Sequence, residues 1–253
     1  MIILVAFVAH WYLSLFTQTF FQHRYAAHRM FTMHPRWERF FFIFTFLTQG
    51  SSFMSPRVYA LLHRMHHAYS DTAQDPHSPH HTSNAFTMMW QTRTVYQQVM
   101  QGKHAAAARF EGNYPEWTAL EELGNKWYSR VGWGALYVLF YAEFATAWWM
   151  FLLLPVHFAM GAVHGAIVNW GGHKYGYQNF DNHDKSRNSL FFDFLTGGEL
   201  FQNNHHKLSS RANFGVKWWE LDPTYPVIWT LDKVGIIRLR QSKSQAEAGR
   251  VAA

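Results

Sequence analysis

The sequence predicts an all-α integral membrane protein with about three to four transmembrane helices. Two observations predict this fold class. Long runs of the 253-residue chain contain one charged side chain or none, and charged residues make up only 15% of the whole, against about 25% in an average soluble domain. Histidine-rich segments also stand at the ends of these apolar runs. We therefore expect the runs to cross or line a bilayer and the histidines to gather at its surface.

The composition restricts the classes of partner. The formal net charge of +6 favours anionic partners such as lipid head groups, phosphates or an acidic protein. No basic run is interleaved with aromatic residues, which argues against nucleic acid. The chain has no cysteine, so its redox compartment cannot be read from cysteine usage. We expect a single domain over residues 1–240 and a polar, disordered tail at residues 241–253.

The first apolar run covers residues 1–22, which contain no Asp, Glu, Lys or Arg. A transmembrane helix takes about 20 residues, so this run is long enough to span. It lacks the basic start and the small-residue cleavage site of a signal peptide. It is therefore predicted to be a span rather than a cleaved leader.

Two further runs are less simple. Residues 131–172 contain one formal charge, Glu143. Because no single straight helix needs that length, they predict two spans joined by a tight turn near Pro155. Residues 40–62 are interrupted by a Gly-Ser-Ser stretch and by Pro56, and this run either spans, re-enters or lies in the interface.

Parity decides between these alternatives. If the histidine clusters meet in one site on one side of the bilayer, the chain crosses an even number of times between them. Residues 131–172 supply two crossings. Residues 29–62 are too short for two full crossings, so the run at 40–62 is expected to lie in the interface or to dip in without spanning. Arginines flank the first two clusters, which places the clusters in the cytoplasm by the positive-inside rule. They are Arg24, Arg29, Arg36, Arg39, Arg57 and Arg64.

The histidine clusters have the spacing of metal ligands. In HRMHH, His63, His66 and His67 stand at i, i+3 and i+4, which places them on one face of a helix. Imidazole suits zinc, copper, iron and nickel. In HRYAAH, His23 and His28 are five residues apart, about 140° around an α-helix. They border the site without having to bind the same side of one ion.

Two more clusters follow later in the chain. In QNNHH, the adjacent His205 and His206 point in different directions, so they can serve two metals. Asn169 and His173 form an i, i+4 pair at the end of the last apolar run. One ion takes about four to six ligands. The candidate histidines therefore imply two ions.

The remaining histidines are better explained without a metal. We expect five isolated ones to be surface residues or hydrogen-bonded core residues: His10, His34, His104, His157 and His183. His80 and His81 are expected in a solvated loop beside Pro79. The sequence lacks the Glu-x-x-His pairs of carboxylate di-iron proteins and the His-Glu-x-x-His signature of zinc proteases. The residues thus indicate an almost all-nitrogen dinuclear site at a membrane surface.

Taken in order, HRYAAH, HRMHHAYSDTAQDPH, VNWGGHKYGY and GGELFQNNHH resemble the histidine boxes of the integral-membrane fatty acid desaturases, most closely the acyl-CoA Δ9 desaturase type. The resemblance covers roughly residues 10–235. It implies an oxidoreductase of fatty acid biosynthesis, which removes two hydrogens from a saturated acyl chain while O2 is reduced to water. It also implies a non-haem di-iron centre in a cytosolic helical cap over the spans.

The resemblance further implies ligands and partners. The iron ligands carried over are His23, His28, His63, His66, His67, His173, His205 and His206. Asn169 matches an asparagine that approaches one iron through water. The substrate is a fatty acyl chain, with acyl-CoA as the first candidate, and electrons come from a separate donor such as a ferredoxin or a cytochrome b5-like protein. In a bacterium the protein would lie in the inner (cytoplasmic) membrane, with its active site facing the cytoplasm.

The sequence departs from the family pattern at two places. Gln202 stands where the third box usually opens with histidine. Either its carbonyl oxygen ligates an iron or that iron is a ligand short; we expect the ligand case, because Gln202 shares a helix face with His205 and His206. Family members commonly have two spans before the first box, whereas 22 residues precede His23. The N-terminus is therefore expected outside, unless the start codon is misassigned.

Two other functions stay open. A hydroxylase of the same superfamily would use the same centre, although the four intervening residues of the first box favour a desaturase. A His-rich metal transporter would carry ligands inside its spans, where the candidates are His157, His164 and Glu143. For desaturation, a narrow apolar tunnel must hold the acyl chain, and its expected walls are the paired spans and residues 40–62. The acyl carrier stays open between CoA, acyl carrier protein and phospholipid.

Overall fold

The computed structural model describes residues 1–240, apart from the side chains of residues 105–107, so the predicted disordered tail at 241–253 lies outside the described residues. The described chain is mostly helical. Its helices are α1 (Ile2–Thr17), η1 (Gln18–Ala27), α2 (Pro35–Gln49), η2 (Gly50–Ser52), α3 (Pro56–Tyr69), α4 (Ala85–Met100), η3 (Ala105–Phe110), α5 (Thr118–Asn125), α6 (Trp127–Phe144), η4 (Trp148–Leu153), α7 (Leu154–Phe158), α8 (Met160–Ala166), η5 (Ile167–Gly171), α9 (Gly172–Lys174), α10 (Gln202–Lys207) and α11 (Thr224–Lys233). The two strands are β1 (Phe31–Met33) and β2 (Ile237–Leu239).

α1 and the π-helical segment η1 form one continuous helix, Ile2–Ala27, of 26 residues. At 1.5 Å per residue it is about 39 Å long, which exceeds the about 30 Å of a hydrocarbon core. α1 is uncharged and carries exposed apolar side chains such as Val5 and Val8. Every residue of η1 is buried. One end of this helix is therefore suited to lipid, and the other is enclosed by protein.

In the part of the chain that the structure describes, Ile2–Ala27 is the one helix long and apolar enough to cross a membrane by itself. A second crossing exists if the pair Trp148–Phe158 and Met160–Lys174, bent by 73°, counts as one span. The three to four predicted crossings are therefore not confirmed. The predicted turn near Pro155 is wrong, because the chain turns where α6 ends at Phe144. Pro155 lies in the first turn of α7, where its missing N–H breaks no helical hydrogen bond.

α2 packs along α1 and presents an apolar stripe to the outside. It begins at Pro35, where the side chain of His34 accepts a hydrogen bond from the backbone N–H of Arg36. The stripe has helical spacing and consists of Trp37, Phe40, Ile43 and Leu47. An outward apolar stripe on a helix too short for an independent span suits the membrane interface predicted for this segment.

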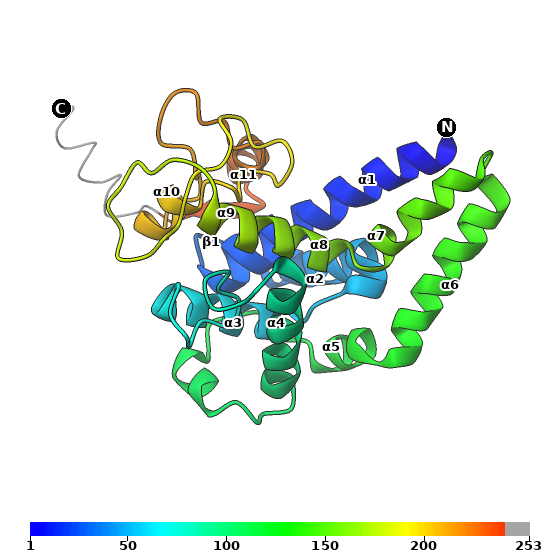
Figure 1. The fold of residues 1–253 in the computed structure, drawn as a ribbon, viewed down its shortest axis with the longest axis horizontal. Helices are drawn as coiled ribbons and strands as arrows, with labels where there is room; N and C mark the ends of the chain where they lie inside the picture. The colour runs from blue at the N-terminus through cyan, green and yellow to red at the C-terminus, as the bar shows by residue number, and fades with distance from the viewer. Residues whose placement is uncertain (241–253) are drawn as a thin grey trace.

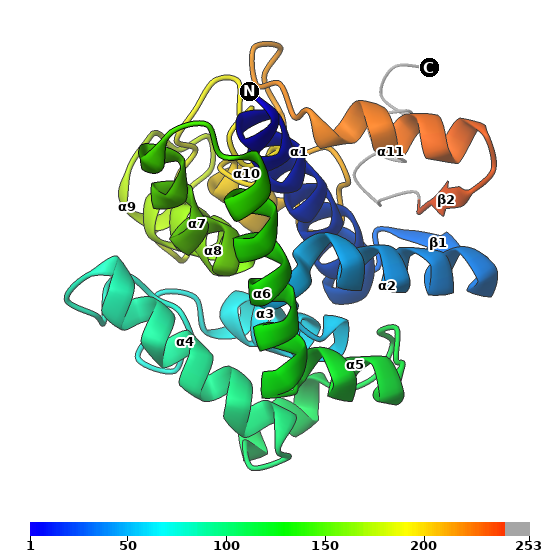
Figure 2. The same ribbon diagram turned by 90° about the vertical axis from the view of Figure 1, so that its right-hand side faces the viewer.

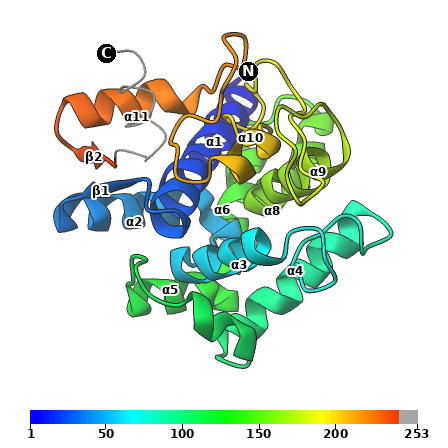
Figure 3. The ribbon, with the colours of Figure 1, turned by 90° about the vertical axis from the view of Figure 1, so that its left-hand side faces the viewer.

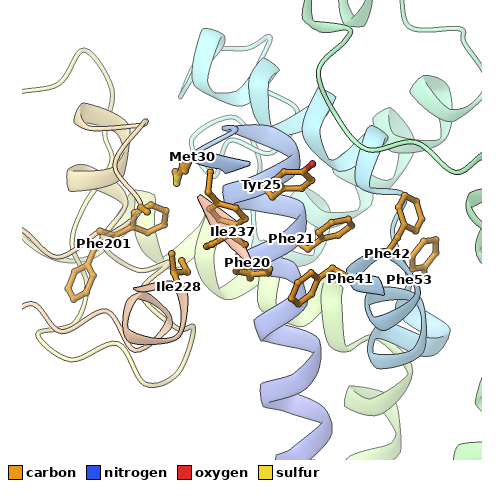
Figure 4. Packing of buried hydrophobic residues seen from close by; sticks show 13 residues of the cluster. Phe20, Phe21, Tyr25, Met30, Phe41, Phe42, Phe53, Phe201, Ile228 and Ile237 are labelled. Atoms are coloured by element: carbon orange, nitrogen blue, oxygen red, sulfur yellow. The ribbon is translucent and has the colours of Figure 1, made fainter. Parts of the chain in front are cut away.

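The largest hydrophobic core lies where η1 meets α2 and the C-terminal elements (Figure 4). Phe20 and Phe21 of η1 pack on Phe41 of α2, with ring centroids 4.8 and 6.3 Å apart. Phe201 and Ile228 join this cluster from the last quarter of the chain. Large aromatic side chains bury the most apolar area per residue. The core therefore fixes the direction of η1, and with it the side chains that follow Phe21.

β1 and β2 tie the end of the described chain to this core. They pair antiparallel, with Phe31 opposite Leu239, and lie beside α2 and α11 (Figure 2). α3 packs against η1, and α4 packs against both α3 and α8 (Figure 3). α9 and α10 lie away from the N-terminus, on the side of the molecule where α1 ends (Figure 1). As a result, η1, α3, α9 and α10 meet in one region.

Candidate metal centre

Eight histidines converge from these four elements into two groups. The first group is His23, His28, His63, His67 and His205, and the second is His66, His173 and His206. Within each group, every ligand nitrogen lies within 4.8 Å of the others. These are the eight histidines that the sequence singles out as ligands. The structure places them together, divided between two positions.

α3 divides its histidines between the groups. Ser55 caps this helix by accepting a hydrogen bond from the backbone N–H of Val58, 3.2 Å away. His63 and His67, one helical turn apart, belong to the first group, whereas His66 belongs to the second. The three imidazoles share a broad helix face, as the spacing predicts. That face lies between the two candidate ion positions.

His23 and His28 join the same group because η1 is a π-helix. The backbone N–H of His28 donates to the carbonyl oxygen of His23 over 3.1 Å, a bond between residues five apart. This is the π-helical register, and it brings His28 back over His23. At 3.6 residues per turn the two side chains would be about 140° apart. The sequence therefore does not show that they share one position.

The imidazole nitrogens face each other at short range. Neighbouring Nε2 atoms are 2.7–3.2 Å apart in the pairs His28–His63, His23–His205, His67–His205 and His66–His206. Two neutral imidazoles can share one proton at most, so several such contacts in one group leave lone pairs facing lone pairs. With metal–nitrogen bonds of about 2.1 Å, neighbouring ligands of an octahedral ion are about 3.0 Å apart. The donor atoms therefore fit a bound transition metal.

A carboxylate stands behind four of the imidazoles. The Nδ1–oxygen distances are 2.9 Å for His66–Asp75, 3.0 Å for His173–Asp71, 2.6 Å for His206–Asp184 and 2.5 Å for His23–Glu199. Such a carboxylate holds the ring and its tautomer so that the Nε2 lone pair points to the metal. The arrangement thus orients the donors before any ion arrives.

Burial sets the charge state of the site. Burial lowers the pKa of four interior imidazoles well below the ordinary value: those of His28, His63, His67 and His205. Neighbouring imidazoles lower the pKa of each further. Burial raises the pKa of Asp71, but the hydrogen bond and charge of His173 outweigh it, and the pKa falls to about 2. At neutral pH the imidazoles of His28, His63, His67 and His205 are therefore neutral, and Asp71 is ionised. This combination favours a cation.

These carboxylates are not predicted from the sequence. Asp71 and Asp75 follow HRMHH directly, four residues apart, and acidic residues at that distance from a ligand cluster are a usable signal. Asp184 and Glu199 come from separate loops and carry no local pattern. They reach the histidines only through the tertiary fold.

Arg24 corrects the topology argument. It is fully buried, and its guanidinium lies 2.9 Å from Glu199 and 2.8 Å from Asp222. A buried charge requires such partners. Arg64 likewise donates to the backbone carbonyls of Ala26 and Ala27. These two arginines serve the protein interior, so the positive-inside argument rests on the other four.

Gln202 and Asn169 lie close to the segment of His173, a member of the second group. Gln202, the first residue of α10, is buried, and its Nε2 donates to the carbonyl oxygen of Glu199 over 2.6 Å. Its side chain packs on Gly172, where an added Cβ would stand 2.5 Å from Gln202 Cγ. Gly172 precedes His173, and Asn169 lies in η5, four residues before that histidine. Both amides are thus attached to the segment that supplies His173.

Two other histidines differ from expectation, and His77, for which the sequence predicts no role, joins a further group. His80 is not simply solvated, since its Nε2 lies 2.9 Å from the carbonyl oxygen of His173 and joins its loop to α9. His157 is buried, and in residues 1–240 neither of its ring nitrogens has a hydrogen-bond partner, so it is not the satisfied core residue predicted. His77 forms a further possible cation group with His66 and Asp75, and nothing in its spacing predicts this.

A cavity of about 620 Å³ adjoins the centre, within the range of about 300–1,000 Å³ usual for ligand pockets. His63 and Asn169 border it at the metal centre. Met54 and Phe158 come from the two segments that the sequence predicts as tunnel walls. α4 forms another wall, through Trp90 and its neighbours, and this helix has no apolar run that would single it out in the sequence.

Comparison with known proteins agrees with the histidine boxes. A family model described as fatty acid desaturase matches residues 1–239. The chain is 29% identical over 236 residues to an sn-1 stearoyl-lipid 9-desaturase of Anabaena variabilis, covering 92% of this chain and 81% of that protein. It is 30% identical over 225 residues to an acyl-CoA 5-desaturase of Anemone leveillei, covering 88% and 66%. It is 26% identical over 242 residues to the Delta-9 acyl-lipid desaturase 1 of Arabidopsis thaliana, covering 91% and 72%.

The family match extends over nearly the whole described chain, and it includes all eight histidines of the two groups. The resemblance predicted from the histidine boxes is therefore confirmed. This chain belongs to the fatty acid desaturase family and is an oxidoreductase of lipid metabolism.

Proposed function

We propose that this enzyme desaturates a saturated fatty acyl chain, in a reaction that uses O2, at two iron ions held by the eight histidines. The observation that carries the proposal is the pair of converging imidazole groups, oriented by carboxylates, beside a cavity large enough for an acyl chain. The first group would hold one ion with five imidazoles. The second has three imidazoles, which leaves positions for oxygen ligands.

Asn169 and Gln202 are the proposed oxygen donors of the second ion. Asn169 would reach it through water, and Gln202 through its carbonyl oxygen. Their support is their place beside His173, on η5 and at the start of α10. A neutral amide in place of a further imidazole keeps the charge of the site unchanged.

Bound iron would supply the activation of O2 that an unreactive methylene group demands. The residues of the protein position the acyl substrate. The cavity holds the acyl chain away from water, and His63 and Asn169 mark the place where the reacting carbons would lie. Arg93 also lines the cavity, which favours a carrier with an anionic group. An acyl-CoA with a Δ9-like outcome is our proposed substrate, and a separate ferredoxin or cytochrome b5-like protein is the proposed electron donor.

We place the metal centre on the cytoplasmic side of the membrane. Four exposed or half-buried arginines near the first two boxes support this side: Arg29, Arg36, Arg39 and Arg57. α1 would cross the bilayer with the N-terminus outside. α6 is not apolar enough to cross by itself, so α6 and the bent pair after it would enter and leave the bilayer together as a hairpin, with α2 in the interface.

Fatty-acid profiling tests the reaction. A host that expresses this chain should accumulate a new monounsaturated species with the double bond at one position, because a fixed cavity holds the chain in one register. His66→Ala should abolish this product and lower the bound iron while the protein stays in the membrane fraction. A hydroxylated product would indicate the hydroxylase instead, and retained activity with full iron would contradict the site.

The carboxylates allow a sharper test. Asp75→Asn keeps the shape of the side chain but removes the charge that orients His66. We expect iron affinity at the second position to fall by about 10–100-fold, the usual effect of losing an outer hydrogen-bond partner of a metal ligand. Asp181→Asn, at an exposed acid outside both groups, is the matched control. Equal iron content and turnover in the two variants would show that Asp75 does not orient a ligand.

Gln202 can be tested by three substitutions. If its carbonyl oxygen is a ligand, Gln202→Ala and Gln202→Leu should both lose most activity, since neither side chain can bind iron. Gln202→His should be tolerated, because imidazole binds ferrous iron at least as well as an amide does. Gln202→Leu separates ligation from packing, because it still fills the space against Gly172. Normal iron and turnover in the Leu variant would leave Gln202 a packing role alone.

A reporter fused to the C-terminus tests the orientation. α11 has ten residues, about 15 Å of helix, which is too short to cross a bilayer. The C-terminus should therefore be on the same side as the metal centre, and the reporter should give a cytoplasmic signal. A signal from the opposite side would overturn the proposed topology without affecting the metal ligands.

A further inference from the structure

Two loops between α9 and α11 expose an unusual number of large apolar side chains. Trp218 is 86% exposed, Phe191 67% and Phe194 55%. We use the name loop patch for Phe191, Phe192, Phe194, Trp218, Trp219 and Leu221. The patch is continuous, because the backbone N–H of Leu221 donates to the carbonyl oxygen of Phe191 over 3.1 Å and the Phe192 and Phe194 rings are 6.0 Å apart. Exposed apolar patches of this kind mark contact surfaces.

The exposure is built into the fold rather than a result of loose loops. The buried carboxylate of Asp193 accepts hydrogen bonds from the backbone N–H groups of Thr196, Gly198 and Leu200 at 2.8–3.0 Å. Glu220 does the same for the N–H groups of Val216 and Lys217 at 2.7 and 2.9 Å. The acidic side chains between the aromatic ones therefore point inward and hold the backbone. The aromatic side chains are left pointing outward from a fixed support.

One contact places the first loop beside the apolar part of the N-terminal helix. The indole N–H of Trp11 donates to the carbonyl oxygen of Leu195 over 3.2 Å. Trp11 lies twelve residues before His23 in the continuous helix Ile2–Ala27, so it is about 18 Å nearer to the N-terminus. The loop at residues 191–195 therefore contacts α1 at a point nearer to the N-terminus than the metal centre. The exposed apolar surface of α1 continues directly into the loop patch.

The chemistry of the patch matches the boundary between lipid head groups and acyl chains. Trp and Phe prefer that depth. The ammonium group of Lys217 lies 5.2 Å from the ring of Trp219 and 5.7 Å from that of Tyr177. A lysine among interfacial aromatics can bury its stem and keep its charge beside anionic lipid. An aqueous partner would provide neither continuity with α1 nor a reason for so many bare aromatic rings.

We propose that the loop patch is a membrane anchor, inserted into the head-group boundary of the leaflet on the side of the metal centre. It would attach the segment that carries His173 and the third histidine box to the bilayer, some 170 residues along the chain from α1. The inference rests on the proposed topology, in which α1 spans. With α1 attached to the bilayer at one edge of the metal centre and the loop patch at another, the centre would be held at a fixed height above the lipid.

The absence of cysteine from the chain allows a direct test. Phe194→Cys and Trp218→Cys would each carry a nitroxide label, with the full chain reconstituted into vesicles of phosphatidylcholine and anionic phosphatidylglycerol. Electron paramagnetic resonance then compares collisions with O2, which concentrates in lipid, and with a water-soluble nickel chelate. Val8→Cys on the exposed side of α1 is the lipid control, and Glu111→Cys at an exposed position after η3 is the aqueous control.

We expect both patch labels to show an O2-to-nickel collision ratio several-fold above that of the Glu111 label. Phe191→Cys provides a third position if either variant does not fold, as judged by circular dichroism. If the patch labels match Glu111 while Val8 lies in lipid, the anchor is wrong, and the patch faces water or a soluble partner. If the label at Val8 has the same low collision ratio as the Glu111 label, the proposed topology is wrong, and the anchor is wrong with it. Desaturation is measured separately, so neither result depends on turnover.

Discussion

The structure depends on holding neutral imidazole nitrogens face to face at 2.7–3.2 Å inside the protein. Without a cation this arrangement is unfavourable, because lone pairs meet and the rings have lost their water. The fold opposes that cost at four of the eight rings, whose Nδ1 faces a carboxylate, and those carboxylates need partners in turn. Asp75 accepts from the backbone N–H of Asp71 as well as facing His66. Glu199 is neutralised by Arg24, which also pairs with Asp222.

This chain of dependence explains why η1 is buried along its whole length. Arg24 follows His23 directly, so one turn of helix must direct an imidazole to the metal centre and a guanidinium to the carboxylates behind it. Arg24 also stacks on Phe214, with its guanidinium carbon 3.8 Å from the ring centroid. The π-helical register then returns His28 to the same group as His23. A regular α-helix through this segment would separate the two imidazoles and leave the first group a ligand short.

How far the sequence predicts this site follows from the range of the interactions. The α3 histidines are predicted because three side chains within five residues obey helical periodicity. The eight ligands as a set are predicted because imidazole clusters are rare outside metal sites. The π-helical register, the burial of Arg24 and the carboxylates at positions 184 and 199 depend on contacts between distant segments, which no local pattern records. The turn predicted in residues 131–172 is wrong for a related reason. Proline is as compatible with the start of a helix as with a turn, and tertiary packing places Pro155 at the start of a helix.

The third box shows how the fold positions ligands where regular structure is nearly absent. α10 has six residues, too few for a helix to be stable by itself. Its position comes from the two asparagines between Gln202 and His205. Asn203 Oδ1 accepts from the backbone N–H groups of Asn179 and Phe180. Asn204 Oδ1 accepts from the Asn179 and Asn188 amides, and its own amide donates to Glu220.

Glu220 thereby connects the ligands to the surface of the molecule. Its Oε2 accepts hydrogen bonds from the Asn204 amide and from the backbone N–H groups of Val216 and Lys217. The loop that presents Trp218 and Trp219 is thus fixed by the same side chain that fixes the helix of His205 and His206. The polar residues around the third box therefore do the work that regular secondary structure does elsewhere in the protein. Their hydrogen bonds hold α10, the six-residue helix that carries His205 and His206.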